Sequence, residues 1–254
     1  MTYYTLAALA ILILGISKTG FGGGGIGILS MPLLIMAMPA ARAVAILGIL
    51  LVLVDLVANL HYLGEYEWPV LKWLLPGAVI GVAIGIWIYF TLQRGGDPRL
   101  FDRKLNFIIG MICLAVVAMQ VWRMLGFNIA TLPTGPKSSI CIGCVAGAAS
   151  AIAHAAGPIV SLYVLQERLE KRRLVGTLLM YTLLINSVKL VMYIAVSLVT
   201  LATLRDSLWM IPILPLGTVL GAWMNRKLPE KPFLVIMYTA AAVASVQMIY
   251  KALA

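Results

Sequence analysis

Apolar stretches long enough to cross a membrane recur along the whole chain, and they constrain its fold more than any other feature. A bilayer core of about 30 Å needs about 20 apolar residues in a helix. With 62% hydrophobic and only 11% charged residues, the chain has too little polar surface for a soluble domain. We expect an all-α polytopic membrane protein with about eight transmembrane segments: Thr5–Met38, Ala40–His61, Trp68–Leu92, Asp102–Gly126, Ser138–Leu165, Arg172–Leu198, Asp206–Leu228 and Pro232–Tyr250.

Two of these segments contain signals that interrupt a helix. The first segment carries a glycine-rich run from Gly20 to Gly27, and each glycine costs roughly 1 kcal/mol inside a helix. The fifth reads His154-Ala155-Ala156-Gly157-Pro158, and its proline suits the first turn of a restarted helix. Broken helices are therefore expected in segments 1 and 5.

The two halves of the chain look like copies of one unit. Pro76 precedes Gly77-Ala78-Val79-Ile80-Gly81 in segment three, as Pro215 precedes Gly217-Thr218-Val219-Leu220-Gly221 in segment seven. Aligning segments two and six places Arg42 on Arg173 and Asp55 on Asn186. We expect two four-span repeats, residues 1–126 and 127–254. Four crossings make the repeats parallel, whereas a re-entrant hairpin in segment one would leave three crossings and invert them.

The net charge of +10 is concentrated in the loops, where it sets topology and attracts anionic lipid headgroups. With eight spans, loops 1–2, 3–4, 5–6 and 7–8 hold twelve Lys and Arg residues, against five on the opposite side. The positive-inside rule then places both termini outside the cytoplasm. This pattern argues for lipid partners and against nucleic acid.

Ionisable residues at mid-membrane depth cost roughly 2.5–3.5 kcal/mol each and are functional candidates. Lys18 lies in the first break, where a new half-helix exposes backbone N–H groups that suit a small anion. The predicted substrate-binding residues there are Ser17, Lys18, Thr19, Gly20, Gly22, Gly23 and Gly24. The alternative is a flexible bend whose lysine extends to the membrane surface.

The second break and two polar helix faces complete the predicted site. His154 and Gly157 mark the break, and His154 can bind an anion or relay a proton. Asn186 and Lys189 share one face with Thr182 and Tyr193, so this face is expected to line a cavity. Asp55 on segment two is a candidate counter-ion or proton carrier. For each of these groups a structural role, such as hydrogen bonding between helices, remains the competing interpretation.

The glycine-rich opening Ser17-Lys18-Thr19-Gly20-Phe21-Gly22-Gly23-Gly24, followed by Pro32, resembles that of the TauE/SafE sulfite exporter family of secondary transporters. The repeated proline and G-x-x-x-G motif of segments three and seven resembles the same family. The resemblance covers nearly the whole chain. It implies export of small sulfur-containing anions, such as sulfite or organosulfonates like sulfoacetate, across a bacterial-type cell (inner) membrane.

The sequence therefore predicts a secondary transporter that works by alternating access. An anion channel is the main alternative, and an intramembrane serine hydrolase using Ser150 and His154 is a weaker one. No catalytic residue, cofactor or metal site is predicted. Cys141 and Cys144 form a C-x-x-C without a second ligand pair, so they are expected to be packing residues. A coupling proton and a homodimer are left open as partners.

Overall fold

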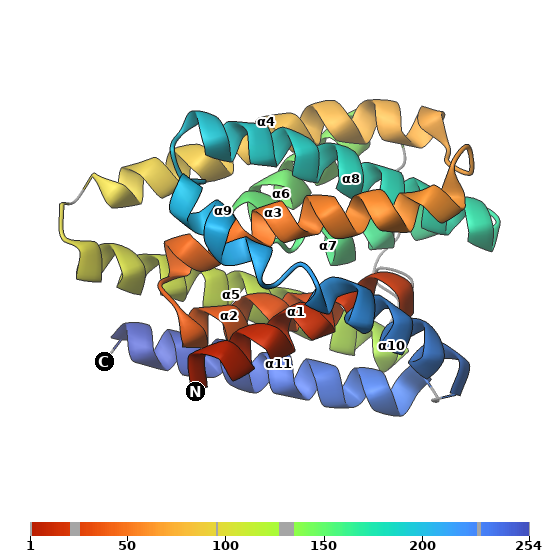
Figure 1. Cartoon of the computed structure of the whole chain (residues 1–254). Coiled ribbons are helices and arrows are strands. Elements are labelled where there is room, and N and C mark those ends of the chain that lie inside the picture. The colour runs from red at the N-terminus through yellow and green to blue at the C-terminus, as the bar shows by residue number, and fades with distance from the viewer. Residues whose placement is uncertain (1, 21–25, 95, 127–134, 228–229, 254) are drawn as a thin grey trace.

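Every element that the structure describes is a helix. The computed structural model describes residues 2–20, 26–94, 96–126, 135–227 and 230–253 (Figure 1). The first half contains α1 (Thr2–Gly20), η1 (Ile26–Leu29), α2 (Ser30–Ala37), α3 (Ala40–Asn59), η2 (Leu60–Tyr62), α4 (Trp68–Gln93) and α5 (Pro98–Met124). The second half contains α6 (Pro136–Ala153), α7 (Ala156–Val164), η3 (Leu165–Glu167), α8 (Lys171–Ala195), α9 (Leu201–Leu208), α10 (Ile213–Lys227) and α11 (Glu230–Leu253). The all-helical prediction is confirmed for these residues.

Six of the described helices are long and apolar enough to cross a membrane. They are α3, α4, α5, α6, α8 and the part of α11 from Pro232 to Leu253. A seventh span results if α9 and α10, which are bent by 51° at their junction, count as one crossing. The chain is thus a multi-pass membrane protein, but the expected count of eight spans is not confirmed.

Helix α6 passes this test of length and composition, but it forms a hairpin with α7, so the two helices together make no net crossing. His154 ends α6 in the left-handed conformation, with φ at 54°, and α7 starts two residues later. Ser139 near the start of α6 then lies 2.6 Å, oxygen to oxygen, from Tyr163 near the end of α7. In one continuous helix these residues, 24 positions apart, would be separated by about 36 Å. The fifth segment is interrupted as expected, but it folds back on itself.

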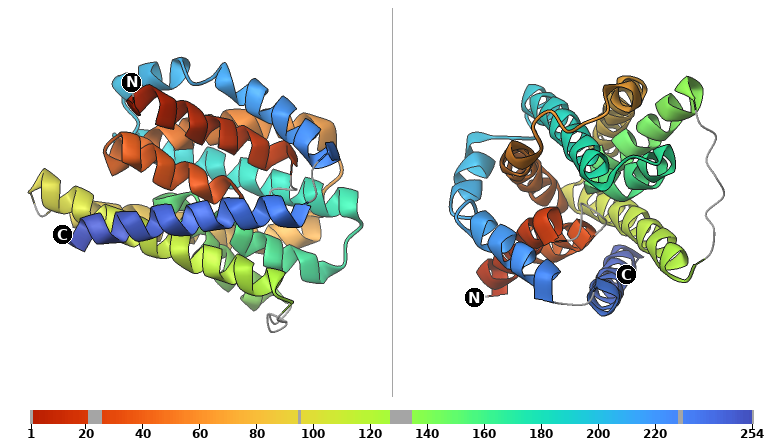
Figure 2. Two further views of the ribbon diagram at one scale, coloured as in Figure 1. Left: turned by 90° about the horizontal axis from the view of Figure 1, so that it is seen from below. Right: turned by 90° about the vertical axis from the view of Figure 1, so that its right-hand side faces the viewer.

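The first segment folds back in a similar way. Helices α1 and α2 lie side by side (Figure 2). At their junction the backbone N–H of Gly27 donates to the Ser17 hydroxyl, with the nitrogen 2.9 Å from Oγ. The glycines between residues 21 and 25 lie outside the described residues. The hairpin alternative for segment one therefore describes this part of the structure better than a broken crossing does.

Equivalent long helices of the two halves run in opposite directions. In Figure 1, α3 and α5 run from left to right, whereas α8 and α11 run from right to left. The first hairpin precedes α3 at the left end, and the second precedes α8 at the right end. Such an arrangement is typical of inverted repeats and not of the parallel repeats that eight crossings would require.

Each hairpin packs on the other half of the chain. Helix α1 lies along α10, and α6 lies along α4, while α3 pairs with α8 and α5 with α11. Glycines allow these close approaches. A Cβ on Gly81 or Gly147 would come closer to a backbone oxygen of the facing helix than real Cβ atoms do. The G-x-x-x-G motifs of α4 and α6 are therefore stripes of small residues along which the two helices pack.

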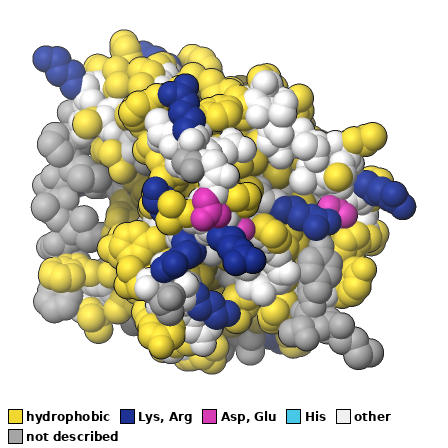
Figure 3. Space-filling model, turned by 90° about the vertical axis from the view of Figure 1, so that its left-hand side faces the viewer, with side chains coloured by type: hydrophobic (Ala, Val, Ile, Leu, Met, Phe, Trp, Pro, Cys, Tyr) yellow, Lys and Arg dark blue, Asp and Glu magenta, His cyan; other side chains and the backbone are white. Residues whose placement is uncertain are grey.

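Two equivalent ion pairs, one near each end of the bundle, join helices of different halves. Arg42 at the start of α3 pairs with Asp206 of α9, and Arg173 at the start of α8 pairs with Glu67, the N-cap residue of α4. The sequence alignment of the two arginines therefore has a structural counterpart. Figure 3 shows Lys and Arg side chains gathered with a few acidic ones on one end of the molecule.

The hairpins also change the count of loop charges. With both segments folded back, the end of the bundle that carries the termini holds seven cationic residues: Arg42, Arg94, Arg99, Arg103, Lys104, Arg205 and Lys251. The opposite end holds ten: Lys72, Arg123, Lys137, Arg168, Lys171, Arg172, Arg173, Arg226, Lys227 and Lys231. The bias of twelve to five depended on eight crossings. The orientation with both termini outside the cytoplasm accordingly stays a prediction.

The contact between α4 and α6 gives a test of this packing. Gly81→Ala should lower the free energy of unfolding by about 1–3 kcal/mol, because the new methyl group meets the backbone oxygen of Cys144. Thermal unfolding in detergent measures the loss. The control is Ala83→Leu, which adds a larger group at an exposed position of the same helix. Equal unfolding temperatures for Gly81→Ala and wild type would contradict the packing.

Candidate functional site

A cavity of about 60 Å³ lies between the two hairpins and is closed laterally by α3 and α8. Its volume is several times the 10–15 Å³ that one water needs, so it suits a small anion. The first hairpin contributes Leu14, Ser17, Lys18, Gly27, Ile28, Ser30 and Met31, and the second contributes Ser150, His154, Ala156, Gly157, Pro158 and Val160. Helix α3 adds Leu47 and Leu51, and α8 adds Val175, Leu178, Leu179, Tyr181, Thr182, Ile185 and Asn186.

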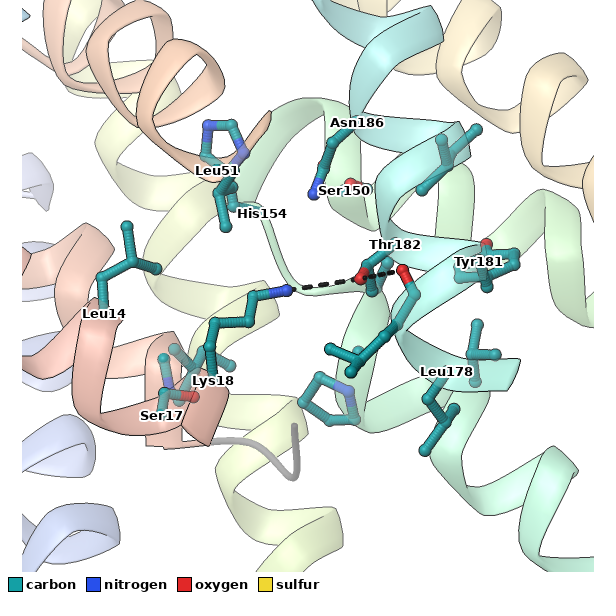
Figure 4. A pocket seen from close by; sticks show the side chains of 18 of the residues that line it. Leu14, Ser17, Lys18, Leu51, Ser150, His154, Leu178, Tyr181, Thr182 and Asn186 are labelled. Carbon is teal, nitrogen blue, oxygen red and sulfur yellow. Dashed lines mark hydrogen bonds between the residues drawn. The ribbon is translucent and has the colours of Figure 1, made fainter. Parts of the chain in front are cut away.

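Lys18 is the cation of this cavity. It lies two residues before the end of α1 and extends toward α8 (Figure 4). Its Nζ is 3.4 Å from the Thr182 hydroxyl and 2.5 Å from Oδ1 of Asp55, and the side chain is only 10% exposed. A lysine extending to the membrane surface would be far more exposed. The structure therefore favours the buried-site interpretation of Lys18 over the flexible bend.

Asp55 lies behind the cavity wall and is fully buried. Its Oδ2 accepts from the Asn186 amide at 2.7 Å. Its Oδ1 lies 3.3 Å from the Thr182 hydroxyl, whose single proton is shared with the Leu179 carbonyl oxygen at 3.0 Å. Asp55 and Asn186, which the repeat alignment made equivalent, thus meet each other between α3 and α8. Because the carboxylate has both an ammonium and neutral donors, its burial is compensated.

Lys189 is the second buried lysine, and it also lies behind the residues that line the cavity. Its Nζ is 3.0 Å from Ser150 Oγ, 3.3 Å from the Ser150 carbonyl oxygen and 2.8 Å from His154 Nδ1. His154 Nε2 is 2.9 Å from the carbonyl oxygen of Val44, which can only accept. The proton of the imidazole therefore belongs on Nε2, and Nδ1 accepts from Lys189.

When Lys189 is protonated, these contacts leave one positive charge near the cavity without a counter-ion. Lys18 is balanced by Asp55, and His154 is neutral in this hydrogen-bond pattern. Among the described residues, no carboxylate lies within ion-pair distance of Lys189. A small anion in the cavity would offset this charge, which is weakly screened in an apolar interior.

The structure brings together most of the predicted site residues. Ser17, Lys18, His154, Gly157 and Asn186 line the cavity, while Asp55 and Lys189 contact lining residues from behind. The Ser17 hydroxyl oxygen accepts a hydrogen bond from the backbone N–H of Gly27. Thr19 and Gly20 end α1, but their surroundings, and Gly22, Gly23 and Gly24, lie outside the described residues.

Two lining residues were missed by the sequence reasoning. Ser30 and Tyr181 are buried, and neither hydroxyl has a hydrogen-bond partner among the described residues. Tyr181 precedes Thr182 but lies outside the Thr182, Asn186, Lys189 and Tyr193 face that the spacing identified. Ser30 is a single hydroxyl in an apolar run, and only its proximity to the glycine-rich break could have drawn attention to it.

The hairpins, the apolar helices and the central charged cavity are features of a membrane transporter. A family model described as "Sulfite exporter TauE/SafE" matches residues 7–248 of the chain. The chain belongs to this family, and the resemblance inferred from its glycine-rich opening is confirmed. No curated protein and no solved structure matches the chain.

The Lys18–Asp55 pair can be tested through stability. Lys18→Ala should lower the free energy of unfolding by about 3–5 kcal/mol, because it leaves Asp55 charged, buried and without a cation. Adding Asp55→Asn to that variant should restore a large part of the loss. Thermal unfolding of the wild type, both single variants and the double variant gives the coupling energy. Additive effects would show that the two side chains do not interact.

Tyr181→Phe tests the unpaired hydroxyl. Removing a buried hydroxyl that makes no hydrogen bond removes no favourable contact, so stability should stay equal or rise by up to about 1 kcal/mol. The thermal unfolding temperature of the anion-free protein measures this effect. A clear decrease would mean that the hydroxyl has a partner in the folded protein.

Proposed function

We propose that the protein is a secondary transporter that exports small sulfur-containing anions across the cell (inner) membrane. Sulfite and organosulfonates such as sulfoacetate are the substrate candidates, and family membership supports this class. The observation that carries the proposal is the cavity between the two hairpins, with Lys18 in its wall and Lys189 behind it. The small cavity volume favours sulfite over the longer sulfoacetate in this conformation.

Alternating access fits the way in which the halves interlock. We propose two inverted repeats, with the boundary near residues 126 and 127. Each repeat supplies one hairpin to the cavity, and each hairpin is packed on a long helix of the other repeat. Rocking of one hairpin and its partner helix against α3 and α8 would open the cavity toward one membrane face at a time.

Export needs no obligatory second ion on energetic grounds. Moving one negative charge out of a cell with a negative interior gains about 2.3 kcal/mol per 100 mV. A coupling proton therefore remains optional, with Asp55 and His154 as its candidate carriers. The hydrogen bonds of His154 to Val44 and Lys189 occupy both ring nitrogens, which makes this histidine the weaker candidate.

The hydrolase alternative loses support from the same geometry. A serine nucleophile needs a base whose free nitrogen reaches its oxygen. The His154 nitrogens are engaged by Val44 and Lys189, and the Ser150 hydroxyl lies against Lys189. Ser150 and His154 are therefore better explained as groups that hold the buried lysine.

Flux in proteoliposomes tests the proposal. Wild-type protein should move sulfite, and Lys18→Ala should reduce the flux by at least about tenfold, because a hydrogen bond between charged groups is worth roughly 1.5–3 kcal/mol. Lys72→Ala is the matched control, since Lys72 is exposed near the start of α4. Saturable flux with counterflow identifies a carrier, whereas large single-channel currents would identify a channel. Unchanged flux in Lys18→Ala would remove Lys18 from the mechanism.

A further inference from the structure

We infer that Asp55 is an internal counter-ion that takes the place of the substrate on Lys18 when the transporter is empty. This inference rests on the proposed function, because only a carrier must reorient its empty binding site from one membrane face to the other. Net export requires that reorientation, whereas exchange of one anion for another does not. A group that serves the empty form alone is therefore recognisable by comparing the two modes.

Lys18 connects the cavity to Asp55, which is buried outside the set of lining residues. From α8, the Asn186 amide donates to one carboxylate oxygen, and the Thr182 hydroxyl shares its proton between the other and the Leu179 carbonyl. An anion in the cavity can approach Lys18 while these two donors keep Asp55 hydrogen-bonded. Asp55 therefore keeps a hydrogen-bond donor, the Asn186 amide, when Lys18 contacts a substrate instead.

The charged groups around this ion pair determine the net charge of the site in the empty and in the substrate-loaded protein. Lys18 comes from α1 and Lys189 from α8, while His154 at the end of α6 is neutral in its hydrogen-bond pattern. In the empty protein Asp55 offsets one of the two lysines. Without Asp55, both lysines would lack a counter-ion while the empty binding site reorients. An uncompensated charge in an apolar interior makes that step unfavourable. The loaded protein would still have the substrate as a counter-charge.

Asp55→Asn should therefore separate the two transport modes. Net efflux into anion-free buffer should fall at least about tenfold, because the empty form carries an added uncompensated charge. Exchange against external sulfite should stay within about threefold of wild type, since the loaded form keeps its counter-charge. The sulfite concentration for half-maximal exchange should also fall, because Lys18 no longer has a competing internal anion.

The experiment uses the full chain in proteoliposomes loaded with labelled sulfite. Efflux is measured once into buffer without anion and once into buffer with unlabelled sulfite. Asp97→Asn is the matched control: it makes the same acid-to-amide change at an exposed residue that caps α5, and asparagine also caps helices well. Retained exchange shows that Asp55→Asn is folded. If that variant is not monodisperse, Asp55→Ser tests the same prediction.

Each remaining outcome contradicts either the counter-ion role of Asp55 or the proposed transport function. An equal loss of exchange and net efflux in Asp55→Asn would overturn the counter-ion role and make Asp55 part of the fold or of the binding site. Unchanged net efflux would also overturn it. Proton movement with the anion, detected by a trapped pH dye and lost in Asp55→Asn, would make Asp55 a proton carrier instead. Absence of any sulfite exchange by the wild-type protein would instead refute the proposed function.

Discussion

The ion pair between Lys18 and Asp55 is the interaction on which the centre of this structure depends. Both groups are almost completely removed from water, so removing either one leaves the other as an uncompensated buried charge. Their contact fixes the end of α1 against α3, and the hydrogen bonds from Thr182 and Asn186 extend the connection to α8. One compensated charge pair therefore links the end of α1 to the long helices α3 and α8 beside the cavity.

Close packing of small residues holds the helices together in a membrane, where burial of apolar surface cannot do so. Lipid tails are as apolar as the helices, so helix association depends on fit and on hydrogen bonds. Gly15 and Gly217 bring α1 against α10, and the glycines of α4 and α6 bring those helices together in the same way. Each hairpin is consequently anchored to the other half, and motion of one half must displace a wall of the cavity.

The sequence was sufficient to predict the helices, the two interruptions and most of the polar groups at the cavity. It was not sufficient to predict the number of crossings. Apolar length shows that a segment can enter the membrane, but not whether it turns back, and the turn at His154 depends on a left-handed backbone that many residues disfavour. Because each turn reassigns every later loop to the opposite side, the two missed hairpins reduce the charge bias from twelve against five to ten against seven. Ser30 and Tyr181 were missed because a single hydroxyl in an apolar run has no periodic signal.

The two halves share an architecture but contribute different charges to the cavity. The first hairpin brings Lys18 to the cavity surface, where its ammonium can meet a substrate. The equivalent turn of the second half brings His154, whose imidazole holds Lys189 behind the wall. One positive charge is thus available for direct contact, while the other acts only through its field. An anion attracted by both would settle against the first hairpin, so binding should bias the position of that hairpin more strongly than that of its symmetric counterpart.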